Sequence, residues 1–137
     1  MILVDFQEKI GISRSDAENW LARLDLSTAY APTVRGIPRN YSRENVLELA
    51  FLAALIKTGW PPRRAVGVVR DVLADTWGPV WLAWPAGRFE EPMGASHIEA
   101  LGVEGLAKQS PHRAISAIHI GDIRATVDRL FSEKGES

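Results

Sequence analysis

Three arginines and a tyrosine crowd a short, turn-forming stretch of the chain, RGIPRNYSREN at residues 35–45. These residues are Arg35, Arg39, Tyr41 and Arg43. A guanidinium group binds a phosphate through two parallel N–H donors, and a tyrosine hydroxyl can donate to the same oxygens. The stretch therefore predicts a basic β-hairpin, a "wing", that lies against a phosphate backbone; the simpler alternative is a solvated loop.

A second polar set precedes this stretch and falls on one face of a predicted helix over residues 14–24. It comprises Arg14, Ser15, Glu18, Asn19 and Arg23. In the major groove of DNA, arginine forks onto guanine and asparagine onto adenine. The candidates for base readout are Arg14, Ser15, Glu18 and Asn19, and Ser13 and Arg23 are candidates for phosphate contact.

Two more arginines, Arg63 and Arg64, follow Trp60-Pro61-Pro62. Prolines belong in the first turn of a helix, so a helix is expected to start here and run to about Ala74. The helix dipole disfavours cations in a first turn by about a few tenths of a kcal/mol. Either a bound phosphate favours the two arginines, or they are solvated and the small cost is tolerated.

The elements that must position these groups begin with two short helices. Leu3, Phe6 and Ile10 have the spacing of an amphipathic helix. Gly11 suits its C-terminal end, and the Ser13 hydroxyl suits the N-cap of the helix that follows. A helix, a glycine turn and a capped second helix are typical of a helix-turn-helix.

A hairpin and a long helix follow. The hairpin is expected around Gly36-Ile37, and Ser42 is expected to cap a helix that runs to Thr58. Residues 46–56 are apolar on nearly every side, which predicts burial by the chain's own domain or by a second subunit.

The second half predicts a small α/β unit. Residues 80–84 and 114–120 read as strands, 97–101 and 103–109 as short helices, and 123–131 as a last helix. The expected fold is mainly α with small β: a winged helix-turn-helix domain at 1–75, then an appendage at 76–137 with two strands and a C-terminal helix. Two strands alone are marginal, so they are expected to pack on the first half or to pair with another chain.

Charge is uneven along the chain although the net charge is −1. Residues 1–70 hold ten basic and seven acidic side chains, and residues 71–137 hold six and ten. A basic half joined to an acidic half fits a DNA reader with a separate assembly or regulatory part. The absence of cysteine excludes disulfides and thiolate metal sites and fits the cytoplasm. The N-terminus does not read as a signal peptide, and the apolar runs are too short to span a membrane.

Taken together, residues 3–73 resemble the DNA-binding domain of MerR-type transcription regulators. The matching pieces are GISR at 11–14, GIPRNYS at 36–42 and ELAFLAALIKTGW at 48–60. The resemblance implies a winged helix-turn-helix that binds double-stranded DNA, with Arg39 and Tyr41 on the sugar-phosphate backbone. The family usually dimerises through a long C-terminal helix, which this sequence does not predict, so the subunits are expected to meet differently.

The sequence thus predicts a cytoplasmic, bacterial or phage transcription regulator that binds DNA as a homodimer, without cofactor, metal or enzymatic activity. The three histidines match no ligand spacing, and no catalytic arrangement or effector site stands out. One alternative is a phage DNA-packaging or excision factor with the same fold. Another is an antitoxin-like protein-interaction module, in which the 46–56 helix and a strand with Trp81 and Trp84 grip a protein.

Overall fold

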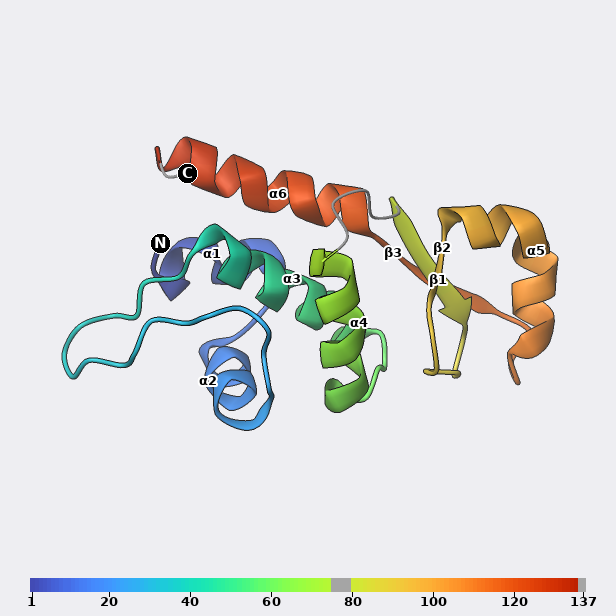
Figure 1. Cartoon of the computed structure of the whole chain (residues 1–137), viewed down its shortest axis with the longest axis horizontal. Coiled ribbons are helices and arrows are strands. Elements are labelled where there is room, and N and C mark those ends of the chain that lie inside the picture. The colour runs from blue at the N-terminus through green and yellow to red at the C-terminus, as the bar shows by residue number, and fades with distance from the viewer. Residues whose placement is uncertain (75–79, 136–137) are drawn as a thin grey trace.

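The computed structural model describes residues 1–74 and 80–135, and within 93–100 only the backbone. The fold is mainly helical with a small antiparallel sheet, as expected (Figure 1). The elements, in chain order, are α1 (Leu3–Ile10), α2 (Arg14–Arg23), α3 (Arg43–Lys57), α4 (Pro62–Ala74), β1 (Trp81–Pro85), β2 (Met93–Gly94), α5 (Ala95–Gln109), β3 (Ile115–His119) and α6 (Ile120–Glu133). Helices α1 to α4 form one end of the molecule, and the sheet and α5 form the other.

The predicted corner between α1 and α2 is confirmed. Gly11 adopts a left-handed conformation (φ +70°) and ends α1. The Asp16 N–H donates to the Ser13 hydroxyl, and the Ser13 N–H donates to the Asp16 carboxylate, each over 3.0 Å. This reciprocal cap starts α2, whose Ala17 and Trp20 are buried.

Helix α3 is the centre of the helical end of the molecule. The Ser42 hydroxyl caps it by accepting from the Asn45 N–H over 3.1 Å. Its side chains from Asn45 to Ala53 are buried, and α1, α4 and α6 pack against it. The all-round apolar pattern is therefore explained by cover from the chain itself.

The sheet has the order β2–β1–β3, with both pairs antiparallel. The two predicted strands correspond to β1 and β3, and the sequence did not indicate the two-residue β2. Helix α5 is interrupted at Gly102 (φ 71°, ψ 162°), which separates the two short helices that were predicted.

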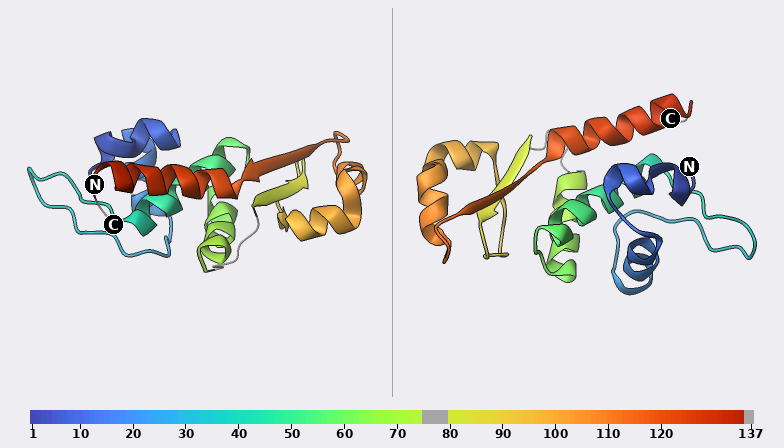
Figure 2. Two further views of the ribbon diagram at one scale, coloured as in Figure 1. Left: turned by 90° about the horizontal axis from the view of Figure 1, so that it is seen from above. Right: turned by 180° about the vertical axis from the view of Figure 1, so that it is seen from behind.

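Helix α6 returns from the sheet to the first half of the chain (Figure 2). It starts three residues earlier than predicted because the Asp122 N–H donates to Nδ1 of His119 over 2.7 Å, which caps the helix. Ion pairs join Asp128 to Arg43 on α3 and Lys134 to Asp5 on α1. Buried side chains of both halves form one hydrophobic cluster, so the second half packs on the first. The predicted domain boundary at 75/76 lies outside the described residues.

Candidate functional site

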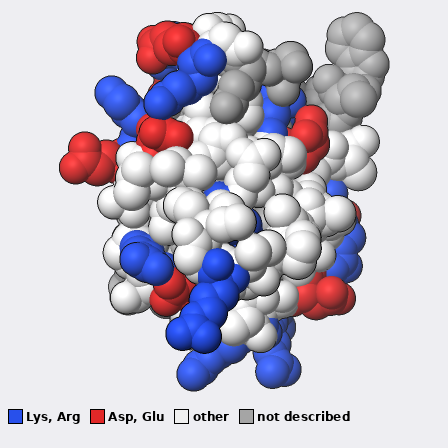
Figure 3. Space-filling view, turned by 90° about the vertical axis from the view of Figure 1, so that its left-hand side faces the viewer, with Lys and Arg blue, Asp and Glu red and all other residues white. Residues whose placement is uncertain are grey.

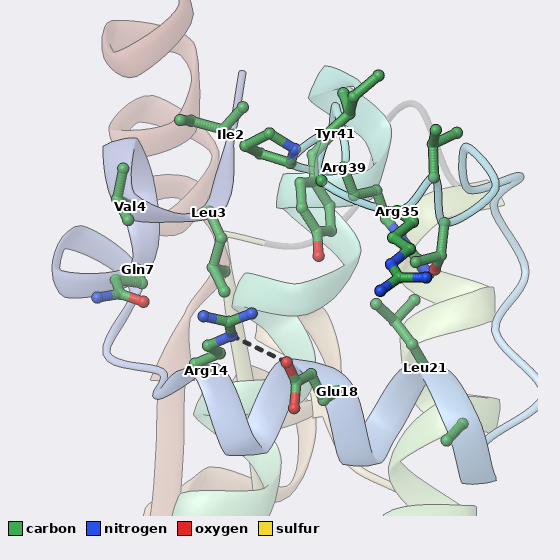
Figure 4. Close-up of a pocket in the computed structure, with 16 residues that line it drawn as sticks. Ile2, Leu3, Val4, Gln7, Arg14, Glu18, Leu21, Arg35, Arg39 and Tyr41 are labelled. Atoms are coloured by element: carbon green, nitrogen blue, oxygen red, sulfur yellow. Dashed lines mark hydrogen bonds and ion pairs between the residues drawn. The ribbon is translucent and has the colours of Figure 1, made fainter.

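A cleft of about 890 Å³ opens between α1, α2 and the loop at residues 33–39 (Figure 4). Five of the predicted contact residues line it: Arg14, Glu18, Arg35, Arg39 and Tyr41. Apolar side chains from α1, α2 and the loop supply much of the remaining wall. The structure thus brings the polar face of α2 and the basic loop together, although they are about 20 residues apart in sequence.

The loop at 33–39 is a minimal hairpin. Val34 and Ile37 form an antiparallel bridge, in which the Ile37 N–H donates to the Val34 carbonyl over 3.1 Å. Arg35 and Gly36 are the two turn residues, one position earlier than predicted, and Gly36 has the positive φ (+79°) that favours glycine. The Arg39 guanidinium donates across the base of the hairpin to the Thr33 hydroxyl.

On α2, Arg14 and Glu18 form an ion pair one helical turn apart, with Nε and Oε1 at 2.9 Å. Both side chains are largely exposed, at 82% and 66%. An exposed ion pair of this kind contributes about 0.3–0.5 kcal/mol to stability. Arg14 can therefore exchange Glu18 for a stronger partner at little cost in free energy. Ser15 and Asn19 are also exposed.

Tyr41 differs from the expectation of a surface loop residue, because its side chain is only 5% exposed. Its ring packs edge-on against Phe6, with 5.2 Å between the ring centres, and against Tyr30, at 6.2 Å. The hydroxyl points into the cleft (Figure 4). Burial raises the pKa of this hydroxyl, so it remains a neutral donor.

A buried polar cluster holds the segment that leads into the hairpin. Glu48 on α3 is 1% exposed, and its carboxylate accepts from the backbone N–H and hydroxyl groups of Ser27 and Thr28 and from the Tyr30 hydroxyl. Burial alone would raise the pKa of Glu48, but these hydrogen bonds outweigh it and lower the pKa below its ordinary value. Asn45, one turn earlier, donates to the Thr28 hydroxyl (2.9 Å) and to the Ala29 carbonyl (3.1 Å).

Sequence reasoning missed this cluster. Its one signal is the presence of Glu48 within an otherwise apolar helical run, since buried carboxylates need partners. Its partners, at residues 27–30, lie in an irregular segment that no periodicity describes.

A second group of arginines surrounds a smaller hollow, of about 370 Å³, between the end of α2 and α4. Arg23 and Arg63 were predicted contacts, and Arg70 joins them. Arg70 follows Arg63 by two helical turns and therefore shares its face of α4, a spacing that could have revealed it. The Asp25 carbonyl accepts a long hydrogen bond (3.4 Å) from Arg70.

Three residues that were predicted to contact phosphate instead make hydrogen bonds within the protein. Arg43 donates to Asp128 on α6 through Nε over 2.6 Å, and Arg64 donates to the Phe89 carbonyl over 3.1 Å. The hydroxyl oxygen and the backbone N–H of Ser13 are both hydrogen-bonded in the cap of α2. The structure therefore separates Arg43 and Arg64 from the two arginine-lined hollows.

Basic side chains project from the lower edge of the helical end of the molecule, which faces the viewer in Figure 3.

Among the described residues, no group of three histidines or carboxylates could hold a metal ion. None of the helices in that part of the chain has the length and apolar character to cross a bilayer.

Comparison with known proteins gave no match to any family model, curated protein or solved structure.

Proposed function

We propose that the protein binds double-stranded DNA as a dimer and regulates transcription. In this proposal, α1 and α2 are a helix-turn-helix and the 33–39 hairpin is its wing. The observation that carries it is the meeting of the exposed polar face of α2 with the arginines of the hairpin along one cleft. Such a cleft fits a ridge of sugar and phosphate, with α2 and the wing on either side.

In this arrangement, Arg14, Ser15, Glu18 and Asn19 face base edges. Arg35, Arg39 and the Tyr41 hydroxyl contact phosphate on the wing side. Arg23, Arg63 and Arg70 offer a second phosphate contact beyond the end of α2. The weak Arg14–Glu18 pair lets Arg14 exchange its carboxylate partner for a guanine.

The experiment is a salt titration of binding to duplex DNA with matched alanine variants. Arg39→Ala is expected to weaken binding to all sequences and to reduce the slope of log K against log salt by about 0.9, the value for one phosphate contact. Arg14→Ala is expected to cost about 1–3 kcal/mol on a preferred sequence and little on others.

The matched control is Arg88→Ala, which removes the same charge at the sheet end, where Arg88 lies 3.9 Å from Glu90. Its salt slope should equal that of the wild type. Equal slopes for Arg39→Ala and Arg88→Ala would refute the wing assignment, and no binding at low salt would refute DNA binding altogether.

A further inference from the structure

In the part of the chain that the structure describes, the outer edge of the sheet carries backbone groups without partners. Strand β3 lies at one border of the sheet, and its register on β1 places Ala117 opposite Ala83. The Ala86 N–H donates to the Ala114 carbonyl over 2.9 Å, which makes these two a hydrogen-bonded pair of the same ladder. Such pairs alternate with non-bonded ones along antiparallel strands. Ala117, three positions beyond Ala114, is therefore in a non-bonded pair, and its N–H and C=O point away from β1.

The same alternation turns the backbone groups of Ile115 outward. Within residues 1–74 and 80–135, no hydrogen bond reaches the backbone N–H or C=O of Ile115 or Ala117. Ala117 is exposed. A row of outward donors and acceptors at this spacing is a template for another β-strand.

This edge also lacks the features by which proteins protect free strands. The sequence of β3, ISAIH, has no lysine, no proline and no carboxylate, and its register on β1 contains no bulge. Exposed apolar side chains adjoin it: Val80 is 52% and Trp81 44% exposed. The Trp81 ring lies edge-on to the ring of His119, with 4.4 Å between their centres.

The strand is compatible with itself in antiparallel pairing. A two-fold axis at Ala117 would set the two Ala117 residues opposite each other as a hydrogen-bonded pair. Ile115 would then lie opposite His119 of the second copy, and Ser116 opposite Ile118, so no like charges meet. An isologous contact of this kind is the commonest in homodimers.

We propose that two copies of the chain join through β3, in a continuous six-stranded sheet of order β2–β1–β3–β3–β1–β2. The inference deepens the proposed function and takes its dimer as a premise, and it names the surface through which that dimer forms. The sheet lies at the end of the molecule remote from the 33–39 hairpin (Figures 1 and 2). Pairing through β3 therefore leaves the cleft and the second arginine group open.

The absence of cysteine from the chain allows a direct test. In a hydrogen-bonded antiparallel pair the Cα atoms are about 5.5 Å apart, within the range of about 4.4–6.8 Å that a disulfide spans. Ala117→Cys, oxidised with diamide at micromolar concentration, is expected to yield mainly a covalent dimer. Ala125→Cys, at an exposed position on α6, is the control and is expected to form little covalent dimer. Crosslinking of Ala117→Cys no greater than that of Ala125→Cys would overturn the proposal.

A second measurement is the mass in solution without DNA. The wild type is expected at twice 15.1 kDa. Ala117→Pro removes the central N–H and should raise the dimer dissociation constant at least about tenfold, whereas Ala117→Ser keeps the N–H and the dimer. A wild-type monomer, or a folded Ala117→Pro variant that dimerises as well as the wild type, would overturn the proposal. If Ala117→Pro does not fold, the proposal is tested by the crosslinking of Ala117→Cys and by the mass of the wild type.

Neither measurement involves DNA, so the two proposals fail separately. A dimer crosslinked through Ala117 that binds no DNA would refute the proposed function and support the β3 interface. A protein that binds duplex DNA but whose Ala117→Cys variant crosslinks no more than Ala125→Cys would refute the β3 interface and leave DNA binding supported.

Discussion

At the scale of the residue, the Glu48 carboxylate fixes where the candidate site stands. It is buried on α3, yet it collects five hydrogen bonds from Ser27, Thr28 and Tyr30. These residues lead directly into the 33–39 hairpin. A carboxylate with this many hydrogen-bond donors is stable in the interior. If residues 27–30 moved away from α3, the Glu48 carboxylate would lose these donors, so the hydrogen bonds hold the segment on α3.

Glu48→Gln is therefore expected to destabilise the protein by about 1–3 kcal/mol at neutral pH, because an amide NH₂ would face groups that themselves donate. Glu44→Gln is the matched control on the same helix, since the Glu44 side chain is 65% exposed, and it should change stability little. The measurement is urea unfolding of both variants and the wild type. A Glu48→Gln variant as stable as Glu44→Gln would show that the cluster does not hold the segment.

The same carboxylate predicts a pH dependence. The folded protein lowers the pKa of Glu48 below its ordinary value of 4.5, so the folded state favours the ionised form. Its stabilisation is complete above about pH 4.5 and is lost as the pH falls through the lower pKa of the folded state. The stability difference between wild type and Glu48→Gln should therefore be constant near neutrality and shrink below about pH 4. A difference that grows on acidification would contradict the assignment.

At the scale of the element, local sequence signals predicted where the helices begin and end. They did not predict which distant residues the helix side chains contact. Gly11, Ser13 and Ser42 act within one turn of themselves, so the ends that they set could be predicted from sequence. The partners of Arg43 and Arg64 are Asp128 and the Phe89 carbonyl, which lie 85 and 25 residues away. No local pattern contains such pairs, which is why both arginines were expected on phosphate.

The interruption of α5 at Gly102 supplies an element-scale prediction. Gly102 combines φ 71° with ψ 162°, a region that is essentially restricted to glycine. Gly102→Ala should therefore destabilise the protein by about 1–3 kcal/mol. Gly105→Ala is the matched control: its new Cβ would meet only the Leu101 Cβ at an ordinary 3.5 Å. Since alanine favours a helix interior over glycine, this control should be neutral or stabilise by about 0.5–1 kcal/mol. Thermal melts that rank the two variants the other way would show that the kink is not required.

At the scale of the whole molecule, α6 makes the two halves of the chain interdependent. It buries Val127, Leu130 and Phe131 in the cluster that contains α1, α3 and α4. Its Arg124 also donates to the Val72 carbonyl at the end of α4 over 2.9 Å. Burial of each large apolar side chain contributes about 1.5–3 kcal/mol. Three of them amount to much of the roughly 5–15 kcal/mol by which a domain is stable.

A fragment of residues 1–74 is accordingly expected not to unfold cooperatively, although it contains every predicted DNA contact. The full chain should show a single transition by circular dichroism, and a peptide of residues 120–135 added to the fragment should restore one. A control peptide with Val127→Asp and Leu130→Asp should not, because its apolar face can no longer be buried. A cooperative fragment without α6 would mean that the first half is an independent domain. The C-terminal helix would then cover the proposed DNA-binding unit without being part of its core.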